Sequence, residues 1–513
     1  MLERELKLYI PASAMPAVKQ RLARLHPENH TLHAIYYDTP DRDLARELAA
    51  LRIRLENDKW VQTLKMAGPD ELSKIEINHG LTKPELDLRK YRGQKAERLF
   101  KHISRHIKPR YETRVQRQTA LLSIGSSTIE IALDEGEIIA GDARLAISEI
   151  EFELVSGDVA ALFEVGESWL NEFQLLIELR SKSERGDVLA KKMLSGELND
   201  YPNSAMALAQ RSYKLPKHSF NTVDTMQACY VQSASLYLNQ VIRNAAFLGG
   251  IDAIQPTIEQ QAQYLTAMRV GMRRLRSCRR LFRQWMTADE KKLSRTLRGY
   301  FALFGDARDH DLLQLEMLPK LRKAGVPGIE HATLPALPTT NPELTAASVD
   351  FQACLLRSLK QLVTQRCIVK NAPSGHELYS TLHKLLAQQL GNIQVASIGF
   401  TQLSTRHQHR LRNWIKSMRY CLDFLGRSEH ADLADDLRTA QHALGKITDL
   451  DVTIDWAREA IDDPEARGYA LGWLTARRQY KQKQSLPVLK NLIQARYPVY
   501  AANKKKAAPK ARA

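Results

Sequence analysis

Cysteine is scarce in this sequence of 513 residues. The chain has five cysteines, an odd number, at Cys229, Cys278, Cys354, Cys367 and Cys421. None lies close to another, whereas zinc sites and disulfide frameworks use closely spaced cysteines. We therefore expect reduced, partly buried thiols.

Long hydrophobic runs are also absent. No apolar stretch approaches the roughly 20 residues that a membrane-spanning helix needs, and the N-terminal MLERELKLYIP is too charged for the core of a secretory signal. With 44% hydrophobic and 26% charged residues, the composition is typical of a globular protein. These features predict a cytoplasmic protein with no membrane partner, and its length predicts two or more domains.

Basic charge is concentrated in the second part of the chain. Residues 1–200 carry 30 Lys and Arg against 33 Asp and Glu, whereas residues 201–513 carry 45 against 25, a net charge of +20. Such a field attracts polyanions, which include nucleic acid, an anionic membrane and polyphosphate.

Residues 1–200 show the pattern of many short strands. Alternating or β-branched runs recur between turn signals such as Gly68-Pro69 and Gly125-Ser126, and they include LKLYI, LRIRLE, KWVQTLKM, SKIEIN, YETRVQRQTALL, STIEIALDEGEII and AISEIEFEL. Helical periodicity appears at about 14–25, 158–173 and 184–194. The pattern predicts an antiparallel β barrel with flanking helices.

Residues 222–495 show the pattern of long amphipathic helices, which predicts an all-α bundle and a multidomain α+β chain overall. The motif RVGMRRLR (269–276) is followed by FGDARDHDL (304–312), and RNWIKSMR (412–419) is followed by LGKITDLDV (444–452). This recurrence predicts a duplicated helical unit. We expect a linker near 325–343, which is rich in Pro and Thr, and a basic disordered tail at 496–513.

Charged and apolar side chains alternate along several of the predicted strands. In LRIRLE, for example, Arg52 and Arg54 alternate with Leu51, Ile53 and Leu55. One interpretation is an ordinary barrel with a solvated, charged exterior. The other is an inverted barrel, whose apolar face packs outward under helices and whose interior is polar. Acidic and basic groups facing each other in such an interior suit a divalent metal that holds a phosphate chain.

The N-terminal motif Glu3-x-Glu5-x-Lys7 resembles the ExExK signature of the CYTH superfamily, the triphosphate tunnel metalloenzymes. The resemblance continues through YYDT (36–39), LRIR (51–54), WVQTLK (60–65), LDEGEI (133–138), SEIEFEL (148–154) and SKSERG (181–186), in the family's order. It implies an eight-stranded antiparallel tunnel over residues 1–200 that acts on triphosphates with Mg²⁺ or Mn²⁺. One departure is Lys74-Ile75-Glu76-Ile77-Asn78, where the family often has Arg-x-Glu-x-Glu, and lysine lacks the guanidinium fork.

The same resemblance implies roles for individual residues. The implied metal ligands are Glu3, Glu5, Glu76, Asp134, Glu149, Glu151 and Glu153. The implied phosphate-binding residues are Lys7, Arg52, Arg54, Lys65, Lys74, Arg114, Lys182 and Arg185. The implied catalytic set is Glu3, Glu5, Lys7, Glu149 and Glu151.

A row of basic residues follows one face of the helix around RVGMRRLR. Arg269, Arg273, Arg276, Arg280 and Arg283 recur at steps of four and three, and His409, Arg412, Lys416 and Arg419 repeat the arrangement. The row is compatible with an exposed basic face or with nucleic-acid binding, but stacking aromatics and a helix-turn-helix signature are absent. A bare phosphate chain fits better than a specific nucleic acid.

This region resembles the CHAD domain, the conserved-histidine α-helical domain, over residues 222–495. The resemblance rests on HRLRNWIKSMRY (409–420), RVGMRRLR, ARDHD and LGKITDLDV. It implies polyphosphate binding by Arg269, Arg273, Arg276, Arg280, His409, Arg412, Lys416 and Arg419. Thr266 stands where the first family histidine is expected, so His409 has no histidine counterpart.

Together these patterns predict a metal-dependent inorganic triphosphatase joined to a polyphosphate-binding helical domain. The expected partners are inorganic triphosphate and polyphosphate, in the cytoplasm and at polyphosphate granules. One alternative is a non-catalytic, granule-associated polyphosphate binder. Another is a tunnel enzyme that acts on thiamine triphosphate or ATP. The sequence does not predict the oligomeric state.

Overall fold

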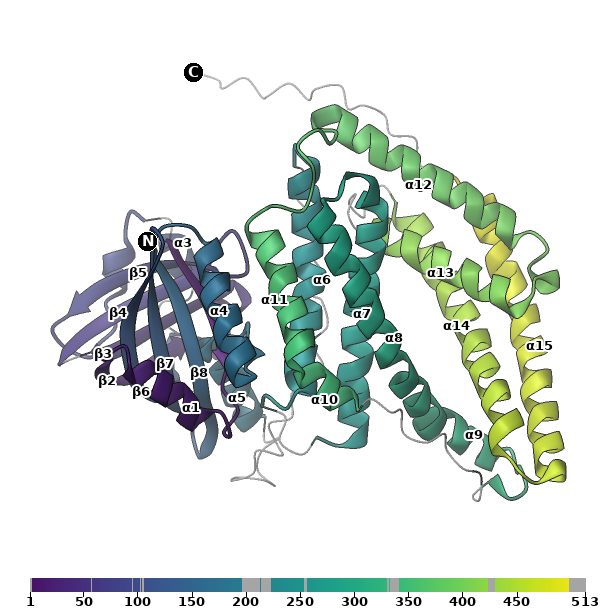
Figure 1. Cartoon of the computed structure of the whole chain (residues 1–513), viewed down its shortest axis with the longest axis horizontal. Helices are drawn as coiled ribbons and strands as arrows, with labels where there is room; N and C mark the ends of the chain where they lie inside the picture. Colours follow the sequence, from purple (N-terminus) through teal and green to yellow (C-terminus); the bar gives the residue numbers. More distant parts are fainter. Residues whose placement is uncertain are drawn as a thin grey trace.

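The computed structural model describes residues 2–56, 58–94, 96–101, 103, 106–195, 213, 223–252, 256–329, 332, 341–422 and 430–497. A β barrel lies at one end of the molecule and long helices occupy the rest (Figure 1). We call residues 2–195 the tunnel domain and residues 223–497 the helical domain. The expected boundaries at 200 and 222, and most of the expected linker and tail, lie outside the described residues.

The tunnel domain is built on one antiparallel sheet with the strand order β5-β4-β3-β2-β6-β7-β8-β1-β9. An additional pairing of β1 with β5 closes eight of these strands into a barrel, as predicted. The strands are β1 (Leu2–Tyr9), β2 (Glu28–Asp38), β3 (Ala49–Glu56), β4 (Lys59–Ala67), β5 (Ser73–Leu81), β6 (Lys108–Ile124), β7 (Ser127–Ala140), β8 (Ala143–Ser156) and β9 (Leu176–Ile177). Alternation did not predict β2, because its sequence ENHTLHAIYYD has no regular apolar period.

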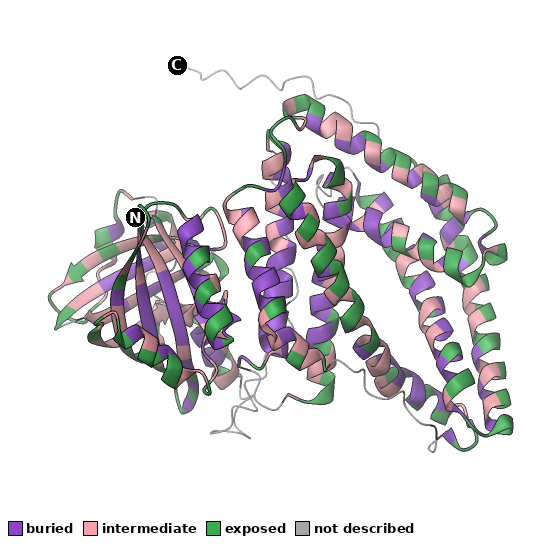
Figure 2. Cartoon of the chain, in the orientation of Figure 1, coloured by how far each residue is buried: buried purple, intermediate pink, exposed green. Residues whose placement is uncertain are grey.

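The barrel is inverted, with its apolar side chains on the outside under helices and loops. Leu6 and Phe152 are fully buried there, and the ring of Phe152 lies 5.9 Å from that of Trp169 on the covering helix α4. Figure 2 shows this buried outer surface beneath the helix. Burial of these outward faces leaves the polar positions of the same strands to line the interior. The helices of this domain are α1 (Met15–Ala23), α2 (Asp43–Arg46), α3 (Glu97–Phe100), α4 (Ala160–Phe173) and α5 (Lys182–Leu194).

The helical domain contains two copies of a basic helix followed by a partner helix. In the first copy α7 packs on α8, in the second α13 packs on α14, and α7 contacts α13. The helices are α6 (Met226–Leu248), α7 (Ile258–Phe282), α8 (Ala288–Asp311), α9 (Leu318–Lys323), α10 (Pro342–Ala347), α11 (Val349–Val363), α12 (Gly375–Ser397), α13 (Thr405–Leu422), α14 (Ala431–Ala460) and α15 (Pro464–Gln494). None of the helices in the described ranges combines the length and the apolar content that a bilayer span requires.

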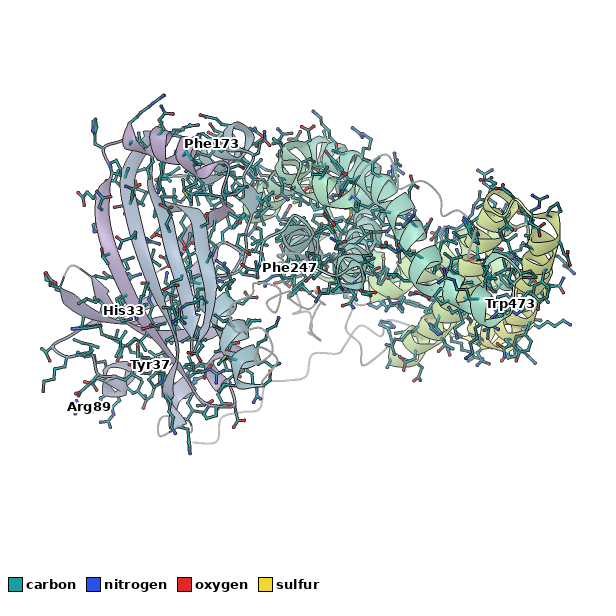
Figure 3. All side chains as sticks on the ribbon, turned by 90° about the horizontal axis from the view of Figure 1, so that it is seen from below. His33, Tyr37, Arg89, Phe173, Phe247 and Trp473 are labelled. Carbon is teal, nitrogen blue, oxygen red and sulfur yellow. The ribbon has the colours of Figure 1, made fainter. Side chains whose placement is uncertain are left out.

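The two domains pack closely against each other. Helix α4 of the tunnel domain lies against α11, and β9 contacts both α6 and α11. The backbone N–H of Ile177 donates a hydrogen bond of 3.0 Å to the buried side chain of Gln352. Figure 3 shows Phe247 of α6 at this junction, while Trp473 lies at the far end of the helical domain. The tunnel is therefore built next to the helical domain rather than joined to it by a linker alone.

Candidate active site in the tunnel and the basic cluster of the helical domain

The interior of the barrel forms a cavity of about 1110 Å³ that extends to α6 and α11 of the helical domain. Alternation along the strands directs every second side chain into it. The charged residues on its wall that the sequence predicted are Glu3, Glu5, Lys7, Arg52, Arg54, Lys65, Lys74, Glu76, Asp134, Glu151, Glu153 and Lys182. The prediction of an inverted barrel with a polar interior is thus confirmed.

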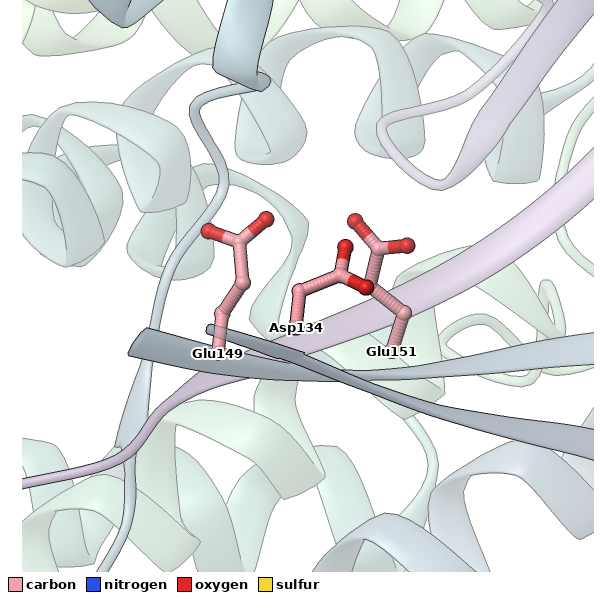
Figure 4. A group of neighbouring side chains, drawn as sticks. All are labelled: Asp134, Glu149 and Glu151. Atoms are coloured by element: carbon pink, nitrogen blue, oxygen red, sulfur yellow. The ribbon is translucent and has the colours of Figure 1, made fainter. Parts of the chain in front are cut away.

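Three of the predicted acidic residues lie together on β7 and β8. Asp134 pairs in register with Glu149, and Glu151 follows on the same face of β8. One carboxylate oxygen from each of the three lies within 4.8 Å of the others. Figure 4 shows the three side chains on the same side of the two strands. We call Asp134, Glu149 and Glu151 the carboxylate triad.

Lys182, the first residue of α5, lies among these carboxylates. Its Nζ is 2.6 Å from Asp134 Oδ2 and 2.7 Å from Glu151 Oε1, and it also contacts Glu149. The start of α5 is held by the Ser181 side chain, which accepts a hydrogen bond from the Glu184 N–H. Although burial opposes ionisation of Glu151, Lys182 and Arg117 hold the pKa of its carboxyl well below the ordinary value.

The remaining acidic residues form a second group around Lys65 of β4. Lys65 Nζ lies 2.8 Å from Glu3 Oε2 and 2.7 Å from Glu76 Oε2. Glu5 and Glu153 lie opposite each other on β1 and β8. Burial and neighbouring carboxylates raise the pKa of Glu5 to about 7 and that of Glu153 to about 8. This side of the tunnel therefore carries more acidic groups than its cations can keep ionised at neutral pH.

Arginines of β3 and β6 face these acids. Arg52 Nη1 lies 3.4 Å from the Tyr36 hydroxyl, and Arg54 contacts Glu56. Burial, together with the positive charges of Arg52 and Arg117, lowers the pKa of Arg54 to about 9. A phosphate chain would relieve this repulsion between guanidinium groups, since each of them can pair with phosphate oxygens.

The prediction that Arg114 binds phosphate in the tunnel is wrong. Arg114 lies on the outer face of β6, where its side chain is 61% exposed and pairs with Glu112 at 2.9 Å. Arg117, which the sequence analysis missed, takes the interior position: its Nε and Nη2 each lie 2.6 Å from Asp134. The turn at Gly125-Ser126 contained the signal, because pairing outward from Ile124 and Ser127 brings Arg117 opposite Asp134.

Arg185 is also placed differently from the prediction, since it is absent from the wall of the cavity. It is fully buried behind Glu149, with Nη1 3.4 Å from Glu149 Oε2. Its Nε and Nη2 bind Asp252 of the helical domain at 2.9 and 2.8 Å. A guanidinium held in this way has no free edge to offer to a phosphate in the tunnel.

The donor set of the triad fits a divalent metal ion. Three carboxylates offer the hard oxygen ligands that Mg²⁺ and Mn²⁺ prefer. Because Lys182 and Arg117 already balance much of their charge, a metal ion would bind best together with an anionic ligand. Among the described residues, the triad is the group of acidic, His and Cys side chains with metal-ligand spacing. Glu3, Glu5, Glu76 and Glu153 of the predicted ligand set lie in the group around Lys65.

In the helical domain, α7 and α13 bring their basic residues together. Arg273 of α7 and Arg308 of α8 lie near Arg412 and Lys416 of α13, and Arg269 of α7 lies beside Arg273 and Arg308. We call these five residues the basic cluster. Lys416 is only 4% exposed, and burial together with Arg273 and Arg412 lowers the pKa of its amine to about 5. Burial likewise lowers the pKa values of Arg269 and Arg412 to about 10 each.

Counter-charges are few around the basic cluster. Arg308 lies 3.7 Å from Asp449 and 3.6 Å from Asp309. In the part of the chain that the structure describes, no carboxylate lies within ion-pair distance of Arg269, Arg273, Arg412 or Lys416. Uncompensated cations at this burial favour a bound anion.

The two copies of the repeat place their arginines in the same way. A Cβ on Gly305 would lie 3.3 Å from the guanidinium of Arg269, and a Cβ on Gly445 would lie 3.3 Å from that of Arg412. Each glycine therefore lets an arginine lie directly over the neighbouring helix.

The other predicted polyphosphate contacts surround this cluster. Arg276 lies 4.7 Å above the Phe301 ring, Arg419 donates to Gln441 at 2.8 Å, and Arg280 is exposed. His409 Nε2 lies 2.9 Å from Asp451 Oδ2, and Asp451 also binds Arg478. This pairing fits a structural role for His409.

The chain matches two family models, and it is also similar to curated relatives. Residues 1–186 match the CYTH domain and residues 246–458 match the CHAD domain. The inorganic triphosphatase of Haemophilus influenzae is 36% identical over 208 residues, which are 39% of this chain. The match spans 58% of the length of that relative.

Solved structures resemble each domain separately. The CHAD domain of the plant Ricinus communis is 19% identical with a TM-score of 0.40, and the match covers 56% of this chain and 98% of that one. A putative adenylyl cyclase from Hippeastrum, described as having a dominant triphosphatase activity, is 21% identical with a TM-score of 0.30. That match covers 36% of this chain and 95% of the Hippeastrum chain. The chain thus contains a CYTH domain over residues 1–186 and a CHAD domain over residues 246–458.

Proposed function

We propose that the CYTH domain hydrolyses inorganic triphosphate to pyrophosphate and phosphate with Mg²⁺ or Mn²⁺, and that the CHAD domain binds polyphosphate. One observation carries the enzymatic proposal. The carboxylate triad lies in a closed barrel whose interior also holds Lys7, Arg52, Arg54, Lys65, Arg117 and Lys182. A pure anion-binding tunnel would gain nothing from acids that face its ligand.

The basic residues of the tunnel would hold the triphosphate in place. Phosphoryl transfer requires mainly positioning and charge neutralisation, and it needs no nucleophilic side chain. Arg52 and Arg54 can pair with phosphate oxygens through their guanidinium groups, and Arg117, whose Nε and Nη2 bind Asp134 and Glu151, through its remaining nitrogen. Lys7, Lys65, Lys74 and Lys182 act as point charges. Because they come from different walls of the cavity, they would hold the phosphates in line along the tunnel.

The carboxylate triad would hold the metal, and Glu3, Glu5, Glu76 and Glu153 would support a second ion or position water. When bound, Mg²⁺ or Mn²⁺ neutralises phosphate oxygens and lowers the pKa of the attacking water. Glu5 and Glu153 have raised pKa values of about 7 and about 8. Either carboxyl can therefore exchange a proton near neutral pH.

The choice of substrate rests on the curated relative, which is an inorganic triphosphatase. The tunnel also admits other triphosphates, so ATP and thiamine triphosphate are the competing substrates. The cavity reaches α6 and α11 of the helical domain. The nucleoside of ATP or the thiazole of thiamine triphosphate would have to lie at that end of the cavity or protrude from its opposite end. A bare triphosphate needs no such room.

Phosphate release from tripolyphosphate, ATP and thiamine triphosphate, each with and without Mg²⁺, tests the proposal. We expect metal-dependent release with a kcat/KM for tripolyphosphate far above that for ATP. Asp134→Asn should abolish most of the metal-dependent phosphate release, whereas Glu137→Gln, on the outer face of the same strand, should leave it unchanged. Equal kcat/KM for tripolyphosphate and ATP would reject the substrate assignment. Full metal-dependent activity in Asp134→Asn or Glu5→Ala would reject the site.

Polyphosphate binding is proposed for the basic cluster, with Arg276, Arg280, His409 and Arg419 at its edges. The buried Arg269 and Arg412 and the buried amine of Lys416, whose charged forms a bound anion would stabilise, support it. Competition between long polyphosphate and DNA at physiological salt tests the choice of ligand, because counterion release weakens both as salt rises. Tighter binding of DNA would reverse the choice. A protein that binds polyphosphate but releases no phosphate from any triphosphate would instead be the non-catalytic binder.

A further inference from the structure

The helical domain contributes one residue to a buried ion network directly behind the carboxylate triad. Asp252 follows α6 and is buried, with its backbone in the left-handed region at φ 51°. Its carboxylate binds two arginines of the tunnel domain. Arg180 Nη1 lies 2.9 Å from Asp252 Oδ2, and Arg185 donates through both Nε and Nη2 at 2.9 and 2.8 Å.

These two arginines lie on either side of Lys182 in the sequence. Arg180 precedes it in the connection from β9, and Arg185 follows it on α5. Asp252 therefore holds both ends of the segment that delivers Lys182 to the triad. A second contact of the helical domain supports the same turn, because Arg243 Nη2 of α6 lies 3.0 Å from Glu184 Oε2.

Arg185 also touches the triad itself. Its Nη1 lies 3.4 Å from Glu149 Oε2, and its Nη2 donates to the Ala146 carbonyl at 2.7 Å. Glu149 and Arg185 are each about 1% exposed, so their contact is shielded from solvent. An arginine that lost Asp252 would keep its charge in a buried place, and the nearest carboxylate left to it is Glu149.

We propose that Asp252 of the helical domain is a positioning residue of the tunnel's metal site. It binds the Arg185 guanidinium in two places and so keeps Arg185 from forming a two-point ion pair with Glu149, which leaves Glu149 with the contacts to Lys182, Lys7 and one nitrogen of Arg185 for a metal ion to replace. The helical domain thereby sets the metal affinity of the tunnel. This inference rests on the proposed function, because it assigns metal binding to the triad.

Mn²⁺ binding to the full-length protein, measured by electron paramagnetic resonance of free Mn²⁺ and by calorimetry, tests the proposal. Changes to residues that orient metal ligands cost about 10- to 100-fold in affinity. We expect Asp252→Asn to raise the Mn²⁺ Kd by about 10-fold. Arg185→Lys, which keeps the charge but cannot bind Asp252 through two nitrogens, should also raise it.

A matched control breaks a different contact between the domains. Arg357 of α11 lies against Glu167 of α4, with its Nε 2.7 Å from Glu167 Oε1. Neither residue touches α5 or the triad, so Arg357→Gln should leave the Mn²⁺ Kd unchanged. Circular dichroism and the Tm of each variant identify those that are folded.

Combining substitutions at Arg185 and Asp252 tests whether Asp252 affects metal binding through Arg185. In an Arg185→Met background Asp252→Asn should have no further effect on the Mn²⁺ Kd, because the competing guanidinium is gone. An equal loss in both backgrounds would overturn the proposal. So would an unchanged Kd in folded Asp252→Asn or, if that variant does not fold, in Arg185→Lys.

The two proposals fail in different ways. If the wild-type protein binds Mn²⁺ but hydrolyses no triphosphate, the proposed activity fails while the role of Asp252 can still be measured. If hydrolysis is as proposed and Asp252→Asn binds Mn²⁺ normally, only the role of Asp252 fails.

Discussion

Arg117 and Asp134 lie directly opposite each other across the β6–β7 hairpin and form a two-point ion pair inside the tunnel, with both N···O distances at 2.6 Å. Arg117 also contacts Glu151, so one guanidinium joins two members of the carboxylate triad. This relationship places a guanidinium that is already bound to two carboxylates at the point where the proposed metal and phosphate meet. It also distinguishes Arg117 from Arg114, three residues earlier on the outer face.

Replacing Arg117 should therefore impair catalysis far more than replacing Arg114. We expect Arg117→Gln to lower kcat/KM for tripolyphosphate by about 100-fold, as removal of one charge-stabilising donor does in other active sites. Arg114→Gln is the control on the same strand and should stay near the wild-type value. A similar loss in both variants, measured by phosphate release, would contradict the assigned faces of β6.

In the metal-free protein, the contribution of Glu5 and Glu153 to stability should fall as the pH rises from about 5 to 8, whereas Lys416, with a pKa lowered to about 5, contributes in the opposite direction. The folded-state pKa values of Glu5 and Glu153 are about 7 and about 8, raised from the ordinary value of 4.5. Between these limits the folded protein keeps protons that the unfolded chain has released. The contribution of the two groups therefore favours folding below about pH 5 and is lost as the pH rises through 7 and 8.

Thermal unfolding in EDTA at pH 5.5 and pH 8 measures this dependence. Glu153→Gln removes one of the two groups that favour the lower pH, so we expect the Tm at pH 8 minus the Tm at pH 5.5 to be more positive than in the wild type. A change in Tm as large as that of the wild type would show that Glu153 does not titrate in this range.

Polyphosphate binding at pH 7 should be accompanied by proton uptake. The pKa of Lys416 is about 5, lowered by burial and by Arg273 and Arg412, so the free protein holds this amine largely neutral. A bound phosphate chain favours the charged form and raises that pKa. Calorimetric titrations in buffers of different ionisation enthalpy should therefore show protons taken from the buffer.

Lys416→Met is the matched variant for this measurement. It should bind polyphosphate with less proton uptake than the wild type, because the titrating amine is gone. Equal uptake in both proteins would assign the proton to another group.

Gly445→Ala should weaken polyphosphate binding without lowering the stability of the protein. A Cβ at this position would lie 3.3 Å from the flexible end of Arg412, which can shift. Alanine in a helix interior stabilises by up to about 1 kcal/mol relative to glycine. We expect an unchanged or higher free energy of unfolding together with a polyphosphate Kd raised by a few fold, on the order of one phosphate contact.

Gly472→Ala on α15 is the control for this pair of measurements. A Cβ there meets nothing within 4 Å, so the change should affect stability in the same direction and leave the polyphosphate Kd at the wild-type value. Weakened binding in both variants would point to a general effect of the substitution rather than to Arg412.

Much of the tunnel follows from local patterns. Alternation in LRIRLE and SEIEFEL separates Leu51, Ile53 and Phe152 from the charged residues between them, and the structure buries these apolar residues on the outer face under helices. Period-two alternation is a property of the strand itself, so the sequence alone predicted which residues share a face, and the resemblance to the tunnel family implied that the charged face lines the interior. The same holds for the basic face of α7, which follows from helical periodicity.

The errors arose where a position depends on pairing between distant segments. The family motif suggested Arg114, but the register of the hairpin places Arg117 inside. Strand β2 has no regular period, and its place between β3 and β6 comes from its pairing partners.

The sequence by itself thus determined the separate charged and apolar faces of the strands, the repeated basic helices and most of the charged residues of both sites, because strand and helix periods act within a few residues. Only the tertiary structure decided that Lys182 joins the carboxylate triad, that Arg185 turns away from the tunnel, and that Asp252 holds it there. These contacts join α5 to β7, β8 and the helical domain, and no local period relates residues so far apart in the chain. Packing of the two domains against each other brings them together.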